Sequence, residues 1–212
     1  MRRKPDAASR RRELCDAAIQ LLAQEGPKGL SHPKVDLRAG VPKGTTSFYF
    51  RTREALLLGL AERLAELDLA DLRSVAGPET GDPAPPPVSR LAVAITRAVT
   101  GDGLPRTRAR LALMLQAERR SALAEVFRRN AEIHAELHRE IVVKSLPPGE
   151  EADPDVISDL TFATLNFISG YLMSVAGDES AVRSAEQLDQ ILIGIADGVA
   201  ARSRRTARQP TR

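Results

Sequence analysis

The sequence is poor in aromatic residues and almost free of cysteine. It contains no tryptophan, two tyrosines and five phenylalanines among 212 residues, and Cys15 is its single cysteine. One cysteine excludes an intrachain disulfide. Cys15 lies at helical spacing from Ile19 and Leu22, so we expect a small core residue rather than a reactive thiol.

Long apolar runs and catalytic motifs are also missing. No stretch approaches the roughly 18 apolar residues of a membrane helix, and no apolar segment of a signal peptide follows Met1–Asp6. The sequence shows no nucleophile elbow, no phosphate-binding glycine loop and no cysteine–histidine metal pair. We therefore expect a soluble cytoplasmic protein that has no membrane partner, is not an enzyme, and needs no cofactor or metal.

Charge is distributed unevenly along the chain. Residues 1–54 carry a net charge of +6, residues 55–201 carry −8, and residues 202–212 carry +5, which together give the modest total of +3. A basic head of this kind favours a polyanionic partner such as DNA. For the basic tail, a DNA contact and simple solvation remain equally open.

The apolar pattern is helical nearly throughout and predicts an all-α fold. The sequence predicts a first helix over 9–25 that stops at Gly26-Pro27, a second helix that carries Val35 and Leu37 inward, and a long leucine-rich helix capped by Thr52. Later helices are expected over 88–100, 105–118, 121–145, 155–176 and 183–203. The Pro/Gly-rich stretch 77–87 interrupts this pattern.

Residues 39–50 have the layout of a helix-turn-helix DNA reader. Gly40 suits a turn that needs positive φ, and Pro42 suits the first turn of the next helix. A short polar helix then follows, whose small side chains can approach bases and phosphates closely.

This region resembles the TetR family of transcriptional regulators. The resemblance is carried by Ala17-Ala18 through Gly26, Ser31, Ala39-Gly40-Val41, Lys43-Gly44-Thr45, Tyr49-Phe50 and Arg53-Glu54-Ala55-Leu56. The chain departs from the family at Pro42, where serine or threonine is common, and at Ser47, where a phosphate-binding tyrosine is common. The resemblance implies that Tyr49 takes over that contact, that Phe50 packs into the core, and that Arg53 holds a phosphate.

From the motif and the resemblance together we predict the following division and DNA-binding set. A three-helix DNA-binding domain spans 1–54, and a long helix joins it to a helical ligand-binding and dimerisation domain over 55–205. The predicted DNA-binding residues are Ser31, Lys43, Gly44, Thr45, Thr46, Ser47, Phe48, Tyr49 and Arg53. For Phe48, a packing role is an equally open alternative.

A pair of histidines and several amides are candidates for an effector site. His134 and His138 are four residues apart on one helix face. The simplest interpretation is a polar edge beside the apolar stripe Ile133, Leu137 and Ile141. The alternatives are a wall of a ligand pocket and a metal site, which would need a third ligand from elsewhere. The predicted ligand-binding residues are Gln116, Phe127, Asn130, His134, His138, Phe162 and Asn166.

The late helices predict assembly. Residues 155–176 are apolar on almost every side, and Ile195 belongs to an apolar stripe on the last helix, so we expect a homodimer through residues 155–203 rather than one monomeric core.

The resulting hypothesis is a repressor that binds a palindromic operator and is released by a small molecule. The alternative is an effector-free DNA-binding protein whose C-terminal helices only dimerise or bind another protein.

Overall fold

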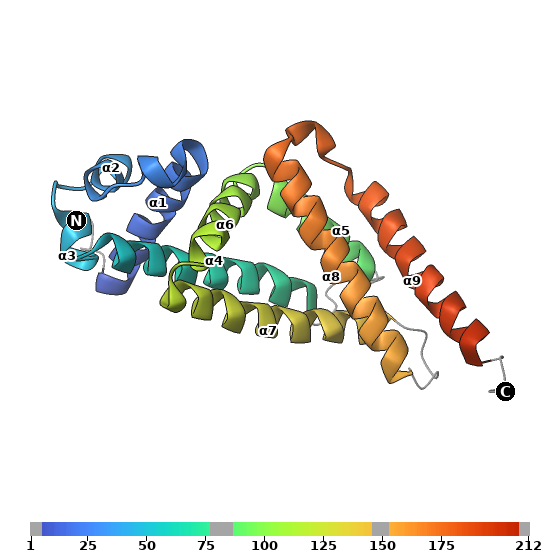
Figure 1. Cartoon of the computed structure of the whole chain (residues 1–212). Helices are drawn as coiled ribbons and strands as arrows, with labels where there is room; N and C mark the ends of the chain where they lie inside the picture. Colours follow the sequence, from blue (N-terminus) through green and yellow to red (C-terminus); the bar gives the residue numbers. More distant parts are fainter. Residues whose placement is uncertain (1–5, 77–86, 146–152, 208–212) are drawn as a thin grey trace. The chain divides into compact units, whose positions relative to one another are not determined.

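The described residues of the chain are arranged mostly in helices (Figure 1). The computed structural model describes residues 6–76, 87–145 and 153–207, and no strand occurs within these ranges. The elements are α1 (Ala7–Gly29), α2 (His32–Arg38), α3 (Thr45–Tyr49), α4 (Arg53–Ala76), α5 (Pro87–Val99), α6 (Gly103–Ala117), α7 (Ser121–Ser145), α8 (Pro154–Gly177), the 3-10 helix η1 (Glu179–Ala181) and α9 (Ala185–Ala207). The predicted all-α class is confirmed.

Local capping chemistry explains where several helices begin and end. The Asp6 carboxylate accepts a hydrogen bond from the Ser9 amide at 2.6 Å, and Thr52 Oγ1 accepts one from the Ala55 amide at 3.0 Å. Such caps satisfy amides that have no partner within the helix. Gly26 interrupts α1 with φ 68°, so the regular part of this helix ends where the sequence predicts.

Packing groups the helices into two compact units. The first comprises the chain up to Asp68 together with Gly101–Ala131, and the second comprises Leu69–Thr100 together with the chain from Glu132 onwards. Two boundaries fall within α4 and α7, and the third lies between α5 and α6. The predicted break at 77–87 lies, except for Pro87, outside the described residues, as do residues 208–212 of the basic tail.

The first unit has one apolar core. Phe50 is 1% exposed and packs with Leu57 and Leu60 of α4, while α6 contributes Leu113 to the same cluster. Gly59 lies against the Phe50 ring, where a Cβ atom would come within 2.5 Å of a ring carbon. The predicted core role of Phe50 is therefore confirmed.

Cys15 belongs to the same core. Its side chain is buried, and burial raises the pKa of its thiol to about 12. The thiol is therefore protonated at neutral pH, which is the state of an unreactive core cysteine.

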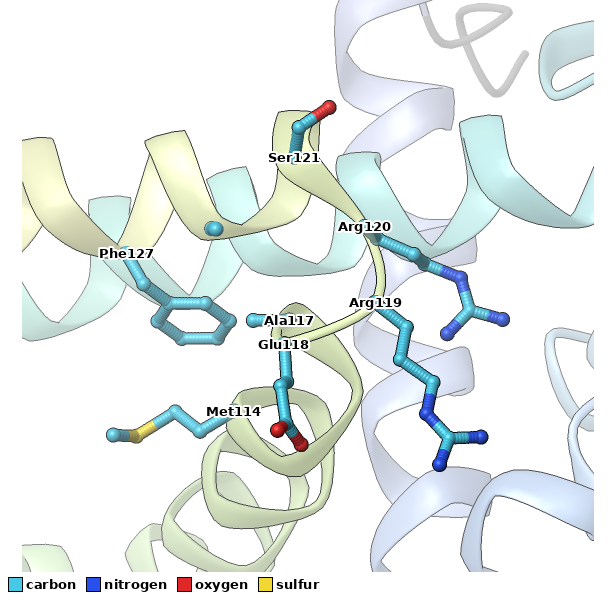
Figure 2. Close-up of a pocket in the computed structure, with 8 residues that line it drawn as sticks. Met114, Ala117, Glu118, Arg119, Arg120, Ser121 and Phe127 are labelled. Atoms are coloured by element: carbon cyan, nitrogen blue, oxygen red, sulfur yellow. The ribbon is translucent and has the colours of Figure 1, made fainter.

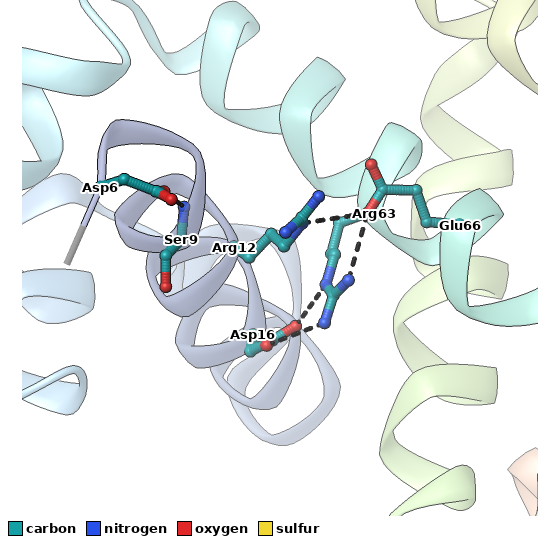
Figure 3. A network of polar contacts seen from close by, with 6 residues as sticks. All are labelled: Asp6, Ser9, Arg12, Asp16, Arg63 and Glu66. Atoms are coloured by element: carbon teal, nitrogen blue, oxygen red, sulfur yellow. Dashed lines mark hydrogen bonds and ion pairs between the residues drawn. The ribbon is translucent and has the colours of Figure 1, made fainter.

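Ion pairs connect α1 to α4 on the surface of this unit (Figure 3). Arg63 Nε lies 2.8 Å from Asp16 Oδ1 on α1, and Arg63 Nη1 lies 3.1 Å from Glu66 on its own helix. Arg12 extends the network to Glu66 at 3.8 Å. Because Arg63 is largely covered, these contacts help fix the helix that follows α3.

The second unit packs α5 against α8 and α9. One cluster joins Leu91 and Ile95 of α5 to Ile141 of α7 and Leu188 of α9. A second cluster joins Val142, Ile157 and Leu160, and Ile195 packs partly against it.

Apolar side chains nevertheless remain exposed on the last two long helices. Phe162 and Met173 of α8 are 71% and 62% exposed, and Ile193 of α9 is 45% exposed. By length and composition alone α8 could cross a membrane, with a mean hydropathy of 1.3 and 17% of its apolar window buried. Within the described part of the chain, α8 thus carries exposed apolar side chains.

A candidate DNA-reading surface and a hollow between α6 and α7

A glycine turn separates α2 from α3. Gly40 has φ 63°, and the Val41 amide donates to the Asp36 carbonyl at 3.0 Å, which closes the turn. Val41 itself packs against the first unit's core. The predicted role of Gly40 is confirmed.

The recognition helix begins later than the sequence predicts. Gly44 adopts φ 90°, and α3 starts only at Thr45, so Pro42 lies in the turn and not in the first helical turn. The Pro42 carbonyl accepts hydrogen bonds from the Thr45 amide at 3.1 Å and from its hydroxyl at 2.6 Å. The prediction for Pro42 was wrong because the left-handed glycine resets the chain direction two residues after it.

Both ends of α3 are held by other helices. At its N-terminus, Asp36 accepts hydrogen bonds from the Gly44 amide, the Thr46 amide and the Thr46 hydroxyl at 2.7, 2.7 and 2.6 Å. At its C-terminus, Arg11 donates to the Tyr49 carbonyl at 2.8 Å. His32 Nε2 lies 2.7 Å from the Phe50 carbonyl oxygen, and it must carry the proton because a carbonyl only accepts.

Two predicted orientations in this region are wrong. Thr46, predicted to contact DNA, is 0% exposed and donates its hydroxyl to Asp36, so its side chain does not reach the surface. Leu37, predicted to point inward, is 82% exposed, and the buried neighbour of Val35 is instead Asp36. In a helix of seven residues the apolar pattern is too short to define the buried face.

The other predicted DNA-binding residues lie at or near the surface. Lys43, Gly44, Ser47 and Arg53 are exposed, whereas Ser31, Thr45 and Tyr49 are partly covered. Ser31 occupies the N-cap position of α2 without a capping hydrogen bond from its side chain. These assignments remain predictions.

Phe48 and Arg53 have specific surroundings. Phe48 is 78% exposed, and its ring meets Tyr49 edge to face at a centroid distance of 5.1 Å. The exposure of its side chain therefore does not support the alternative that Phe48 packs into the core of the first unit. The Arg53 guanidinium donates to the carbonyls of Leu30 and Pro27, which places it at the start of α4 with further donors to offer.

Sequence reasoning missed Asp36, Arg11 and His32. Each acts through a hydrogen bond to a residue 8 to 38 positions away. The spacing of apolar residues carries no signal for such contacts.

The predicted effector residues are divided between the two units. Gln116, Phe127 and Asn130 belong to the first unit, whereas His134, His138, Phe162 and Asn166 belong to the second. Phe162 and Asn166 are exposed, and Asn166 donates to the Phe162 carbonyl of its own helix at 2.8 Å, so their prediction as pocket walls was wrong for the single chain. The two residues are four positions apart and share the exposed face of α8.

His138 is a buried partner of α8. It is 2% exposed, and its Nε2 lies 2.6 Å from Thr164 Oγ1, whose own proton goes to the Leu160 carbonyl at 2.7 Å. Burial, helped by the nearby His134, lowers the pKa of His138 to about 4. Within the described residues no cluster of three potential metal ligands occurs.

A hollow lies at the junction of α6 and α7 (Figure 2). It has a volume of about 520 Å³ and is open to solvent. Met114, Ala117, Ala124 and Phe127 form its apolar part, and the remaining lining residues are Glu118, Arg119, Arg120 and Ser121. Phe127 is thus the one predicted effector residue that lines it.

Comparison with known proteins identifies the relatives of this architecture. Residues 14–60, which include α2, α3 and the start of α4, match the model of the bacterial regulatory proteins of the tetR family. No curated protein sequence matches the chain.

Solved structures match the fold over most of the chain. The multidrug binding protein EbrR complexed with ethidium is 24% identical, with a TM-score of 0.58 and coverage of 90% of this chain and 99% of its own. A TetR-family member from Streptomyces coelicolor A3 is 24% identical, with a TM-score of 0.61 and coverage of 88% and 97%. A regulator from Saccharomonospora viridis in complex with choline is 15% identical, with a TM-score of 0.72 and coverage of 90% and 96%.

Proposed function

We propose that the chain is a TetR-family regulator, because residues 14–60 match the model of the bacterial regulatory proteins of the tetR family. The proposed role is that of a cytoplasmic repressor that reads a palindromic operator with α3. The observation that carries the proposal is the surface of α3 itself. Its buried residue Thr46 faces Asp36, and its exposed residues Ser47 and Phe48 follow directly. Because hydrogen bonds to Asp36 of α2 hold its buried side, α3 can present a rigid surface of polar and aromatic side chains to a DNA groove.

Each exposed group has a chemical counterpart in duplex DNA. An aromatic side chain makes apolar contact with the C5-methyl group of thymine in the major groove, which suits Phe48. Lys43 suits a phosphate oxygen, and so do the donors that Arg53 keeps beside the N-terminus of α4. The net positive charge of residues 1–54 attracts the negatively charged phosphates of DNA.

The proposal includes a homodimer formed through residues 155–203. The exposed apolar side chains of α8 and α9 support it, because burial of such side chains against a second copy removes apolar surface from water. Two copies related by a two-fold axis would read two half-sites of a palindrome.

The proposal also includes release by a small molecule. Ligand pockets in proteins are mostly apolar and span about 300–1,000 Å³, and the hollow lined by Met114 and Phe127 falls within this range. Two of the similar proteins were solved with ethidium and with choline. The hollow is open to solvent and not enclosed. The second candidate function is therefore an effector-free DNA-binding protein whose C-terminal helices only dimerise or bind another protein.

Filling the hollow separates the two candidates. A small-molecule library is screened against the wild-type protein by thermal shift, and hits are tested for release of bound DNA. We expect Ala124→Trp to abolish the thermal shift and the release while DNA affinity stays unchanged. Ala131→Trp, exposed on the same helix but outside the hollow, is the control and should respond like the wild type. A library without hits, or hits that Ala124→Trp still binds, would favour the effector-free alternative or another site.

The DNA-binding part is tested by the salt dependence of affinity. Log K should fall linearly with log salt concentration, and Lys43→Ala should reduce that slope by about 1. Arg139→Ala removes one exposed positive charge from α7 and should leave the slope unchanged. Equal slopes for Lys43→Ala and the wild type would show that Lys43 does not contact a phosphate.

A further inference from the structure

Asp36 is a buried carboxylate with an unusually full set of donors. It is 4% exposed, and its two oxygens accept three hydrogen bonds of 2.6–2.7 Å, two from Thr46 and one from the Gly44 amide. Burying an ionised carboxylate is costly unless it is hydrogen-bonded. The three donors therefore compensate a charge that the α2 helix brings into the interior.

The pKa of Asp36 agrees with this geometry. Burial alone would raise the pKa, but the hydrogen bonds from the Thr46 side chain, the Thr46 amide and the Gly44 amide, together with nearby His32, hold it below its usual value. Asp36 is thus a carboxylate at neutral pH, which is the form that accepts all three bonds.

The helix that Asp36 contacts cannot stand alone. α3 contains five residues, and isolated helices shorter than about 12 residues are marginal in water. Its N-cap residue is Gly44, which has no side chain to satisfy the first amides. Asp36 supplies from α2 the cap that Gly44 lacks, and its negative charge lies at the positive end of the short helix.

We propose that Asp36 and Thr46 form a positioning pair that sets the orientation of α3 and thereby the sequence discrimination of the protein. This inference rests on the proposed reading of DNA by α3. Because the Thr46 hydroxyl is fixed to Asp36, rotation of α3 about its axis would break a buried charge-assisted hydrogen bond. Ser47 and Phe48 therefore keep one fixed presentation to DNA, although neither Asp36 nor Thr46 touches it.

The first experiment compares Thr46→Val with Thr46→Ser. Valine keeps the side-chain volume and removes the hydroxyl, which leaves the Thr46 amide as the single donor to Asp36 Oδ1. Serine keeps the hydroxyl. A duplex enriched from a randomised library by the wild-type protein is the specific probe, and the same duplex with a scrambled half-site is the reference. We expect Thr46→Val to lower the ratio of specific to scrambled affinity about tenfold, and Thr46→Ser to restore it.

A double-mutant cycle tests the pairing itself. Asp36→Ala leaves the Thr46 hydroxyl and two amides without an acceptor, and Thr46→Val leaves the carboxylate short of a donor. In Asp36→Ala/Thr46→Val the valine no longer faces a buried charge, so the combined loss of discrimination should be smaller than the two single losses added together. Additive losses would mean that the two residues act independently and would overturn the proposal.

Hydrogen exchange in the free full-length protein gives a second readout that needs no DNA. Thr46→Val and Asp36→Asn should speed exchange of the amides of residues 44–50 while residues 54–66 of α4 keep wild-type protection, which also shows that the variants are folded. If the wild-type protein enriches no duplex, the proposed function fails. Hydrogen exchange over residues 44–50 then tests by itself whether Asp36 and Thr46 hold α3 in place. Unchanged exchange over 44–50, or unchanged discrimination by Thr46→Val, would overturn the positioning role.

Discussion

At the scale of single residues, burial determines the protonation of His138. The pKa of this histidine is about 4 in the folded chain against 6.5 for an unperturbed histidine, because it is enclosed between α7 and α8. Between pH 6.5 and 4 the unfolded chain binds a proton that the folded chain does not. The stabilising effect of a neutral His138 is therefore present above pH 6.5 and is lost as the pH falls towards 4.

The size of this effect is measurable. At 1.36 kcal/mol per pKa unit, the free energy of unfolding should fall by about 3 kcal/mol over this range. His138→Gln keeps a side chain that can bond Thr164 but does not titrate, so urea unfolding at several pH values should show a flatter pH dependence than the wild type. An identical pH dependence of both proteins would show that His138 is not the titrating group.

Residue-scale predictions from the sequence succeeded where one residue type has a strong local preference. Gly40 adopts positive φ, Thr52 caps α4, and Cys15 is buried. They failed for Thr46 and Leu37, because the buried face of a helix of five or seven residues is decided by contacts with distant helices. The Asp36 carboxylate is such a contact, and nothing near it in the sequence indicates it.

At the scale of elements, the fit between α4 and the end of α3 depends on one glycine. Gly59 leaves room for the Phe50 ring, and a Cβ atom there would lie 2.5 Å from a ring carbon. We expect Gly59→Ala to lower the free energy of unfolding by about 1–3 kcal/mol, although alanine favours a helix, because the core is already filled.

Measuring the cost of Gly59→Ala in a Phe50→Leu variant separates a clash with the Phe50 ring from other causes of destabilisation. Phe50→Leu shortens the side chain that meets residue 59, so Gly59→Ala should cost less in that background than in the wild type. Thermal unfolding of the four proteins measures both costs. An equal cost in both backgrounds would locate the strain somewhere other than the Phe50 contact.

The helices themselves were predictable from the sequence to within a few residues. The expected segment 121–145 coincides with α7, and 155–176 differs from α8 by one residue at each end. Proline and glycine mark the two ends of α8, which begins at Pro154 and ends at Gly177. The packing of α6 with the first unit was not predictable, since the apolar pattern of a helix shows that it has a buried face and not which helix covers it.

At the scale of the whole molecule, the exposed apolar side chains of α8 and α9 predict assembly. Ile193→Glu would place an unpaired charge in the proposed interface and should convert dimer to monomer in sedimentation. Ile193 is a better test than Ile195, which packs partly inside its own chain. Leu115→Glu, which changes an 82% exposed leucine of α6, is the control and should remain dimeric. A dimer that survives Ile193→Glu would place the interface away from this residue.

If α3 reads a specific DNA sequence, affinity selection from a pool of randomised duplexes will reveal that sequence. The wild-type protein should enrich an inverted repeat of two half-sites. Phe48→Ala should enrich a different or less restricted half-site, and replacing thymine by uracil should weaken wild-type binding where Phe48 meets a methyl group. Enrichment of no sequence by the wild-type protein would show that α3 does not read DNA specifically. Enrichment of the same half-site by Phe48→Ala and the wild type, with no effect of uracil at any thymine, would show that Phe48 does not take part in reading.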